Sequence, residues 1–273
     1  MNFNYQSSAV KEIVERALAE DIGTGDITSE LTVPAGLMAS GTFYSREHCV
    51  VAGLGLLELM YETVELLARD GDEVGEDAPL AHVSGSARHL LSRERTALNF
   101  MQRLSGVATN ARRYVQALEG TSCHVLDTRK TTPGLRVLEK MAAAAGGVKN
   151  HRMGLYDAVL IKNNHIAAAG GVRPALERAL GQHDIVEIEV RTFDELRDAL
   201  EMGATRLLLD NLSPDEAHEW IEYIDGRASV EISGGVTLDT IRAYAEAGAD
   251  FISVGAVTHG ARSVNLNFRL TLQ

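Results

Sequence analysis

Short apolar runs alternate with amphipathic stretches along the second half of the chain. From the second run onward they start 21 to 27 residues apart, and the six runs span 123–128, 158–162, 185–190, 206–210, 229–233 and 251–255. Helical patterns lie between the later runs, at 193–202, 213–223 and 238–247. This spacing predicts consecutive β-α-β units and a parallel sheet. Because no Gly-x-Gly-x-x-Gly motif opens a unit, it favours a complete or truncated β/α barrel over a dinucleotide-binding fold.

The part of the chain before these runs has a mixed pattern. Apolar residues at helical spacing over 10–18 predict a first amphipathic helix behind a capping Ser7 or Ser8. The segments that follow predict a strand, a helix and a strand, over 39–53, 56–68 and 79–84. Over 88–118 apolar residues recur every three or four positions, and the interruption at Ser105-Gly106 predicts two consecutive helices.

The two patterns together predict an α/β protein of two domains. Residues 1–110 are expected to form a mixed α/β domain, and residues 111–263 a parallel β/α barrel, complete or truncated, of about six to seven strands. The last residues, NLNFRLTL at 265–272, alternate polar and apolar positions, unlike the buried barrel runs. We therefore expect a C-terminal strand over 264–273 to leave the barrel and pair with the sheet of the first domain.

Composition and charge narrow the partners. With 45% hydrophobic and 23% charged residues the chain is globular, and its net charge of −12 argues against a nucleic-acid or anionic-membrane surface. Four of the five lysines nevertheless fall within residues 129–162, together with three arginines and only Glu139 and Asp157. Seven minus two gives +5 for that segment and −17 for the rest. A cationic segment in an anionic protein predicts a small polyanionic ligand.

The cellular compartment is also predicted from the sequence. The N-terminal residues lack a basic start followed by an apolar run, and no apolar stretch approaches the roughly 20 residues that span a bilayer. Cys49 and Cys123 are single and widely separated, which is typical of reduced buried thiols. We expect a cytoplasmic protein.

Ionisable residues and glycines follow the barrel runs, where barrel enzymes place their chemistry. In chain order these are Asp127-Thr128-Arg129-Lys130, Lys162, Glu189, Asp210, Ser233-Gly234-Gly235 and Gly255. Parallel strands place them on one rim, although each member taken alone could equally be structural. A Gly-rich turn before a helix opening at Thr237 is typical of phosphate binding.

The remaining candidates have more than one interpretation. Glu189 and Asp210 could bind Mg²⁺, accept hydrogen bonds from sugar hydroxyls, or balance the cations of the rim. Arg152, next to His151, suits a planar polycarboxylate as well as a phosphate. A polar face on the 88–103 helix, which includes Arg95, is by default a solvated surface.

Several longer strings resemble one enzyme family. They are EDIGTGDIT (20–28), RTALN (95–99), LDTRKTTPGLR (126–136), KNHRMGLYDAVLIKNNH (149–165), LLLDN (207–211), SGG (233–235) and SVGAVTH (253–259). Together they are similar to the decarboxylating quinolinate phosphoribosyltransferases, over nearly the whole chain. The resemblance implies an N-terminal sandwich with an incomplete barrel, and a dimer or higher oligomer whose active sites are completed by the neighbouring subunit.

The resemblance also implies a reaction and a set of site residues. Quinolinate and phosphoribosyl pyrophosphate would give nicotinate mononucleotide, pyrophosphate and CO₂, with Mg²⁺ as the cofactor. Four residues would act in catalysis, namely Lys130, Lys162, Glu189 and Asp210. The two carboxylates of quinolinate would be held by Arg129, His151, Arg152 and Lys162, and by Arg95 of the neighbouring subunit.

Phosphoribosyl pyrophosphate would occupy the rest of the rim. Its pyrophosphate would meet Lys130, near Thr128, and its ribose hydroxyls and the metal would meet Glu189 and Asp210. Its 5′-phosphate would lie in the two glycine turns, formed by Ser233, Gly234, Gly235, Val254, Gly255 and Ala256. One position departs from the family pattern, because Asn163 stands where an acidic residue is usual, which weakens any metal site there.

Three other functions fit parts of the pattern. A molybdenum-associated paralogue of the same fold would retain parts of the TRK string, but here the NHRMGLYD and LIK strings are intact. A barrel aldolase would use Lys162 as a Schiff-base amine, which borohydride trapping would detect. A small-anion sensor would bind without turnover.

Overall fold

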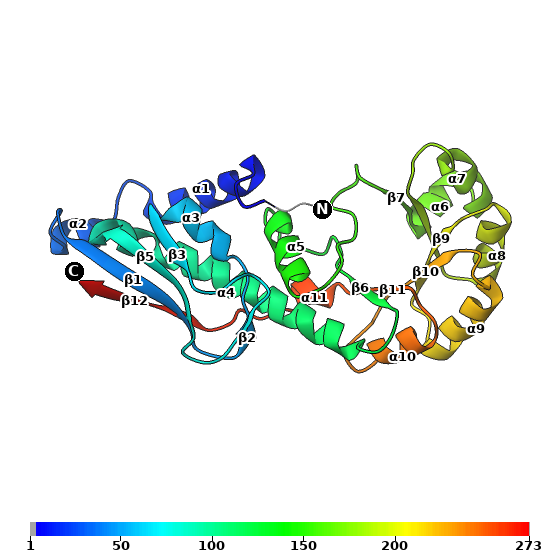
Figure 1. Cartoon of the computed structure of the whole chain (residues 1–273). Helices are drawn as coiled ribbons and strands as arrows, with labels where there is room; N and C mark the ends of the chain where they lie inside the picture. Colours follow the sequence, from blue (N-terminus) through cyan, green and yellow to red (C-terminus); the bar gives the residue numbers. More distant parts are fainter. Residues whose placement is uncertain (1–3, 273) are drawn as a thin grey trace. The chain divides into compact units, whose positions relative to one another are not determined.

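The computed structural model describes residues 4–272, which divide into two compact units (Figure 1). The first comprises Met1–Arg112, Thr131–Gly147 and Val257–Gln273, and the second comprises Arg113–Lys130 and Val148–Ala256. This division places residues 131–147 and 257–263 with the first unit, whereas the sequence-based boundaries place them in the barrel.

The first unit is built on an antiparallel sheet. Within residues 4–272 its strand order is β12-β1-β5-β3, with bounds Leu266–Leu272, Met38–Ser45, Pro79–Ser86 and Thr63–Leu66. Strand β12 pairs with β1 from Ala39↔Leu272 to Ser45↔Leu266, so the expectation that the C-terminal strand joins this sheet is confirmed. Alternate residues of β1 are buried, and the ring of Phe43 lies 4.7 Å from that of Phe268.

The helix expected over 56–68 is confirmed only for Leu57–Met60, and its second half is wrong. The chain instead forms η1 (Leu54–Leu56) and a short α3 (Leu57–Met60), and then enters strand β3. Thr63 to Leu66 pair with Ser84 to Ala81 of β5, so pairing with a neighbouring strand overrides the local apolar spacing. The other elements before the long helix are α1 (Ser8–Ile22), α2 (Ile27–Thr32), β2 (Cys49–Val50) and β4 (Glu73–Val74).

The two helices expected over 88–118 are one helix, α4 (Ala87–Ala117). Ser105 does not break it, because its hydroxyl hydrogen-bonds the backbone N–H and C=O of Ala52. A Cβ on Gly106 would lie 1.9 Å from the carbonyl oxygen of Arg262. The small residues in the middle of α4 therefore allow other segments of the first unit to approach the helix closely.

The second unit contains a parallel sheet of six strands among the described residues. The strand order is β6-β11-β10-β9-β8-β7, with bounds His124–Leu126, Phe251–Ser253, Ser229–Ser233, Arg206–Asp210, Val186–Val190 and Val159–Ile161. The first strand pairs with the last, as in a closed barrel, but within residues 4–272 no pairing joins β6 to β7. The expected α/β fold with an incomplete parallel barrel is confirmed.

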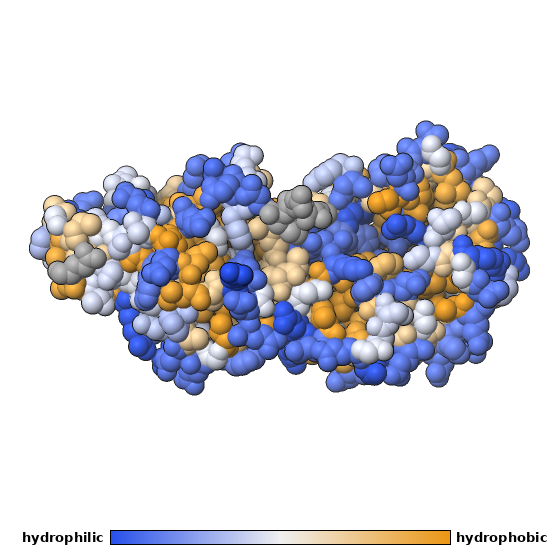
Figure 2. All heavy atoms as spheres, in the orientation of Figure 1, coloured by the Kyte–Doolittle hydropathy of each residue, from blue (hydrophilic) through white to orange (hydrophobic). Residues whose placement is uncertain are grey.

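Helices follow the strands of this unit, as the β-α-β pattern predicts. They are α6 (Asn163–Ala169), α7 (Val172–Ala179), α8 (Phe193–Glu201), α9 (Pro214–Ile224) and α10 (Ile241–Glu246). Every residue of β8 is buried, which is why its sequence lacks the alternation of a half-exposed strand. Hydrophilic residues make up most of the visible outer surface of this unit, with patches of apolar residues between them (Figure 2).

Two further expectations concern membranes and thiols. In the part of the chain that the structure describes, no helix is both long and apolar enough to cross a bilayer. Cys49 and Cys123 are free and buried, as expected, and burial raises the pKa of the Cys123 thiol to about 12. Neither thiol is poised as a nucleophile.

Candidate active site

Oppositely charged side chains meet at the carboxyl ends of β7, β8 and β9. The Lys162 Nζ lies 3.3 Å from Glu189 Oε2, and Arg191 Nη2 lies 3.4 Å from Glu189 Oε1. Arg191 Nε lies 3.6 Å from Asp210 Oδ2. The structure therefore brings together Lys162, Glu189 and Asp210, as the strand-end argument predicts, and adds Arg191. The Lys162 side chain is thus paired with a carboxylate at the rim.

The two carboxylates at this rim are unequally exposed and influence each other. Glu189 has a side chain only 6% exposed, and Asp210 accepts a hydrogen bond from Asn211 Nδ2 at 2.8 Å. Partial burial raises the pKa of Asp210, with a further contribution from the negative charge of Glu189. Two carboxylates that repel each other are stabilised by a bound cation or by hydroxyl groups that donate hydrogen bonds to them.

Asp127 ties the loop before β7 to the end of β6. Its buried carboxylate accepts hydrogen bonds from Asn150 Nδ2 at 2.6 Å and from the backbone N–H of His151 at 2.9 Å. The backbone of Lys149 bridges to Leu126 in parallel. Asp127 thus holds the backbone at His151 in place, and with it the position of the adjacent Arg152.

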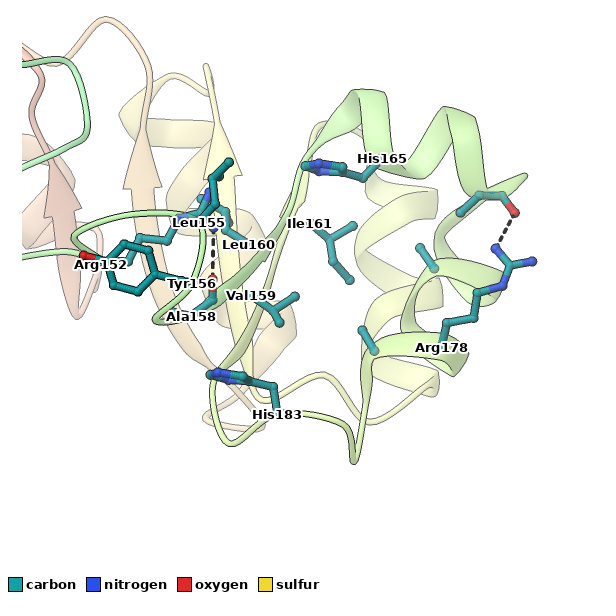
Figure 3. Close-up of a pocket in the computed structure, with 13 residues that line it drawn as sticks. Arg152, Leu155, Tyr156, Ala158, Val159, Leu160, Ile161, His165, Arg178 and His183 are labelled. Atoms are coloured by element: carbon teal, nitrogen blue, oxygen red, sulfur yellow. Dashed lines mark hydrogen bonds between the residues drawn. The ribbon is translucent and has the colours of Figure 1, made fainter. Parts of the chain in front are cut away.

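Arg152 is half-buried beside a second guanidinium. Burial, and next the positive charge of Arg129, lower the pKa of Arg152. Its Nη1 donates to the carbonyl of Ala158 at 3.0 Å, and the side chain lines a cavity of about 470 Å³ beside β7, α6 and α7 (Figure 3). Two neighbouring guanidinium groups in a partly desolvated place favour a bound anion.

Two buried glutamates lie beneath the rim, and the strand-end argument misses both. Glu187 lies on β8 and Glu231 on β10, with exposures of 9% and 4%. Their Oε2 atoms are 3.4 and 3.5 Å from His151 Nε2. Burial, and next the charge of Glu187, raise the pKa of Glu231 to about 7. The available signal was a charged residue inside an otherwise apolar run, in VEIEV and in SVEIS.

The glycine turn after β10 packs against the end of β9. Ser233 accepts a hydrogen bond at its carbonyl from the N–H of Asn211, at 2.9 Å. The labelled helix α10 begins at Ile241, but its first turn already opens at Thr237, whose carbonyl accepts hydrogen bonds from the N–H groups of Thr240 at 3.2 Å and Ile241 at 2.9 Å. The Thr240 hydroxyl in turn accepts a hydrogen bond from the N–H of Thr237 at 3.0 Å, so a helical turn follows the glycines as the sequence predicts.

Gly234 is expected to tolerate substitution far less than its neighbour. It has a φ of +95°, and a Cβ there would lie 2.3 Å from Asn211 Oδ1 and 2.8 Å from Asn211 N, whereas Gly235, at φ +63°, has open space around it. Gly234→Ala should lower the free energy of unfolding by about 2 kcal/mol or more, and Gly235→Ala by about 1 kcal/mol. Urea denaturation measures both, and equal losses would contradict the packing argument.

The remaining predicted residues lie in three places. Thr128 accepts a hydrogen bond from the N–H of the exposed Lys130 at 3.1 Å, just beyond β6. The Val254-Gly255-Ala256 turn follows β11, and Val254 donates to the carbonyl of Leu126 at 3.0 Å. Arg95 is exposed on α4 in the first unit, and is not among the groups gathered at the barrel rim.

The cationic segment 129–162 is divided by the fold. Residues 131–147 belong to the first unit, where Lys140 is fully buried in α5 (Arg136–Ala145). In the same unit Glu139 pairs with Arg103 at 2.8 Å, so Arg103 does not lie on the solvated helix face that the sequence suggested. Of the +5 of the segment, two cations minus Glu139 leave +1 in the first unit, and five cations minus Asp157 leave +4 in the second.

Comparisons with known proteins agree with these features. A family model described as the quinolinate phosphoribosyl transferase C-terminal domain matches residues 107–269, and the corresponding N-terminal domain model matches residues 26–105. The chain is 38% identical to the mitochondrial quinolinate phosphoribosyltransferase (decarboxylating) 2 of Nicotiana glauca, over 96% of this chain and 82% of that protein.

Bacterial proteins match over a larger share of their own length. A probable nicotinate-nucleotide pyrophosphorylase (carboxylating) of Bacillus subtilis is 38% identical, over 96% of this chain and 94% of that protein. Among solved structures, NadC from Streptococcus pyogenes superposes with a TM-score of 0.94 at 33% identity, covering 100% of this chain and 99% of that one.

Proposed function

The chain belongs to the quinolinate phosphoribosyltransferase family, and on that premise we propose that it makes nicotinate mononucleotide. The reaction transfers the phosphoribosyl group of phosphoribosyl pyrophosphate to quinolinate and releases pyrophosphate and CO₂. The single observation in the structure that supports it best is the guanidinium pair of Arg129 and Arg152, half-buried at the rim of the barrel. A dicarboxylate is the small anion that two guanidinium groups hold most specifically.

The other rim residues take the cosubstrate in this proposal. Lys162 contributes a further cation toward the quinolinate carboxylates, and Lys130 toward the pyrophosphate. The 5′-phosphate is bound by backbone N–H groups of the turns at Ser233-Gly234-Gly235 and Val254-Gly255-Ala256, which follow the neighbouring strands β10 and β11. Together the two substrates have about six negative charges, so a cationic rim is needed for affinity even in an acidic protein.

The chemistry requires orientation and charge placement and no covalent intermediate on the protein. As pyrophosphate departs, positive charge develops on the ribosyl carbon, and the carboxylates of Glu189 and Asp210 lie at the rim to stabilise it. The quinolinate nitrogen then bonds to that carbon and becomes cationic. The adjacent carboxylate then departs as CO₂, and the cationic ring stabilises the electron pair left on the ring carbon that carried it. This ring carbon afterwards accepts a proton.

We propose Mg²⁺ as the cofactor. Glu189 and Asp210 fit it, because they are oxygen ligands near the carboxyl ends of the adjacent strands β8 and β9. Mg²⁺ is usually bound through one or two carboxylates together with substrate phosphates. When bound, it would neutralise negative charge on the pyrophosphate. Asn163 begins α6 and offers only an amide there.

The function is tested by incubating the purified protein with quinolinate and phosphoribosyl pyrophosphate. We expect CO₂, pyrophosphate and nicotinate mononucleotide in equal amounts. Turnover of nicotinate and not of quinolinate would overturn the substrate assignment, and binding of quinolinate without turnover would indicate a sensor. The two buried free thiols suit a reducing compartment, so we place this activity in the cytoplasm.

We propose that the enzyme is a homodimer whose sites are completed by Arg95 of the partner subunit. Arg95→Ala and Lys130→Ala variants should each be inactive, and their mixture should regain about a quarter of wild-type activity. Random subunit exchange makes about half of the dimers hybrids, and each hybrid has one intact site. The measurement is the rate after subunit exchange, which mass spectrometry can verify.

A matched mixture controls for unspecific recovery. Arg129→Ala mixed with Lys130→Ala should stay inactive, because both residues lie in the second unit of the same chain and every hybrid site retains one defect. If exchange occurs and the Arg95 mixture also stays inactive, Arg95 does not act across the interface.

A further inference from the structure

Both ring nitrogens of His151 are engaged within the protein. Its Nδ1 accepts a hydrogen bond from the backbone N–H of Arg152 at 2.7 Å. Its Nε2 faces the two buried glutamates of the barrel interior, at 3.4 Å from Glu187 and 3.5 Å from Glu231. All three groups belong to the second unit, and the imidazole itself is only 14% exposed.

These contacts assign the tautomer of the imidazole. A ring nitrogen that accepts an N–H has no hydrogen of its own, so in the neutral ring the hydrogen is on Nε2. Nε2 is the nitrogen that lies 3.4 and 3.5 Å from the carboxyl oxygens of Glu187 and Glu231, which are good acceptors in a buried place. The backbone of His151 is in turn held by the buried Asp127. The ring is therefore fixed at both nitrogens and at its main chain.

We propose that Glu187 and Glu231 are positioning residues that hold His151 as the Nε2–H tautomer, so that His151 fixes the backbone of Arg152 for quinolinate. This inference rests on the proposed function only in naming the ligand. Arg152 is then restrained at its N–H by His151 and at its guanidinium by the carbonyl of Ala158, at 3.0 Å. His151 accordingly acts through Arg152, and not as a cation that pairs with a substrate carboxylate.

A divalent cation between the three side chains is the main alternative. Ligand atoms of His151, Glu187 and Glu231 all lie within 4.8 Å of one another. A metal would need the lone pair of Nε2, and a metal-bound histidine usually donates an N–H from its other nitrogen. Here that other nitrogen is an acceptor, since it faces the N–H of Arg152. The hydrogen-bond pattern therefore favours a protonated Nε2 over a ligating one.

The tautomer can be measured on the wild-type protein without substrate. In ¹⁵N-histidine-labelled protein at pH 7.5, the His151 ring, assigned by comparison with His151→Gln, should show a protonated Nε2 and an unprotonated Nδ1. A doubly protonated ring, or a proton on Nδ1, would overturn the proposal. So would binding of one Zn²⁺ per chain that Glu231→Gln abolishes. Because this spectrum needs no turnover, its outcome is independent of the proposed function.

Kinetics test the consequence for Arg152. Glu231→Leu, which removes one of the two acceptors of Nε2 but keeps an apolar fit, should raise the KM for quinolinate about tenfold, the usual effect of losing such a supporting contact. The KM for phosphoribosyl pyrophosphate should stay within about twofold, and Glu231→Gln, which still offers an oxygen, should recover most of the quinolinate affinity. Equal increases in both KM values, or no recovery with glutamine, would indicate a general structural role and overturn the proposal.

Discussion

Replacing Arg152 by alanine is expected to lower kcat/KM for quinolinate by about two to three orders of magnitude and to leave the protein folded. Arg152 is half-buried, and its burial and then the charge of Arg129 lower its pKa, so a bound dicarboxylate would offset both effects. Truncating one member of a partly desolvated charge pair costs about 2–5 kcal/mol, and each 1.4 kcal/mol is tenfold. The loss should fall mainly on quinolinate binding.

Isothermal titration with quinolinate measures this directly, and circular dichroism verifies the fold. Arg178→Ala is a matched control, because Arg178 lines the same cavity (Figure 3) but lies on α7 and donates to the carbonyl of Ala169. It should change quinolinate affinity by no more than about twofold, as expected for an exposed contact. If Arg152→Ala binds quinolinate with wild-type affinity, Arg152 does not take part in quinolinate binding.

The barrel strands could be predicted because each is a short apolar run bounded by polar residues. The helices between them have recognisable N-terminal capping signals, such as the capping box of Ser213 and Glu216 at the start of α9. The carboxyl ends of parallel strands share one edge, so Lys162, Glu189 and Asp210 could be grouped before any coordinates. The contacts of Arg191 with the last two agree with that grouping.

Other features depend on tertiary contacts that a local pattern does not encode. Gly106 has the low helix propensity of a helix break, yet it lies inside α4. A glycine is needed there because the backbone at Arg262 occupies the place where a side chain would be. Residues 63–66 have helical spacing together with their neighbours, yet they pair with β5. Both errors arise where packing between distant segments outweighs a propensity of about 1 kcal/mol per residue.

The buried glutamates show a different kind of limit. Glu187 and Glu231 could be noticed in the sequence as charges within strands, but their partner His151 comes from a loop that Asp127 holds in place. Likewise, Lys140 contributes to the cationic segment in the sequence but is buried in α5 of the first unit. Net charge along a segment therefore overstates the field at the site, because chain order does not say which charges face the ligand.

Glu189→Gln is expected to lower kcat about 100- to 1000-fold, the usual loss when a preorganised charge at a reacting centre is removed. The Glu189 side chain is 6% exposed and contacts Lys162 and Arg191, so the isosteric amide leaves two cations where positive charge must develop on the ribosyl carbon. The measurement is kcat with both substrates saturating. Asp194→Asn is the matched control, since it removes one negative charge at the start of α8 from a side chain 81% exposed, and it should stay within about twofold.

Asp210 provides the sharper test of the same charge argument. Asp210→Asn alone should also reduce kcat, by about tenfold or more, because Arg191 contacts both carboxylates. If the two carboxylates act on one developing charge, the double variant should lose much less than the product of the single losses, since residues that act as a unit are non-additive. Fully multiplicative losses would mean that Glu189 and Asp210 serve separate steps, and an unchanged kcat in Glu189→Gln would exclude it from the reaction centre.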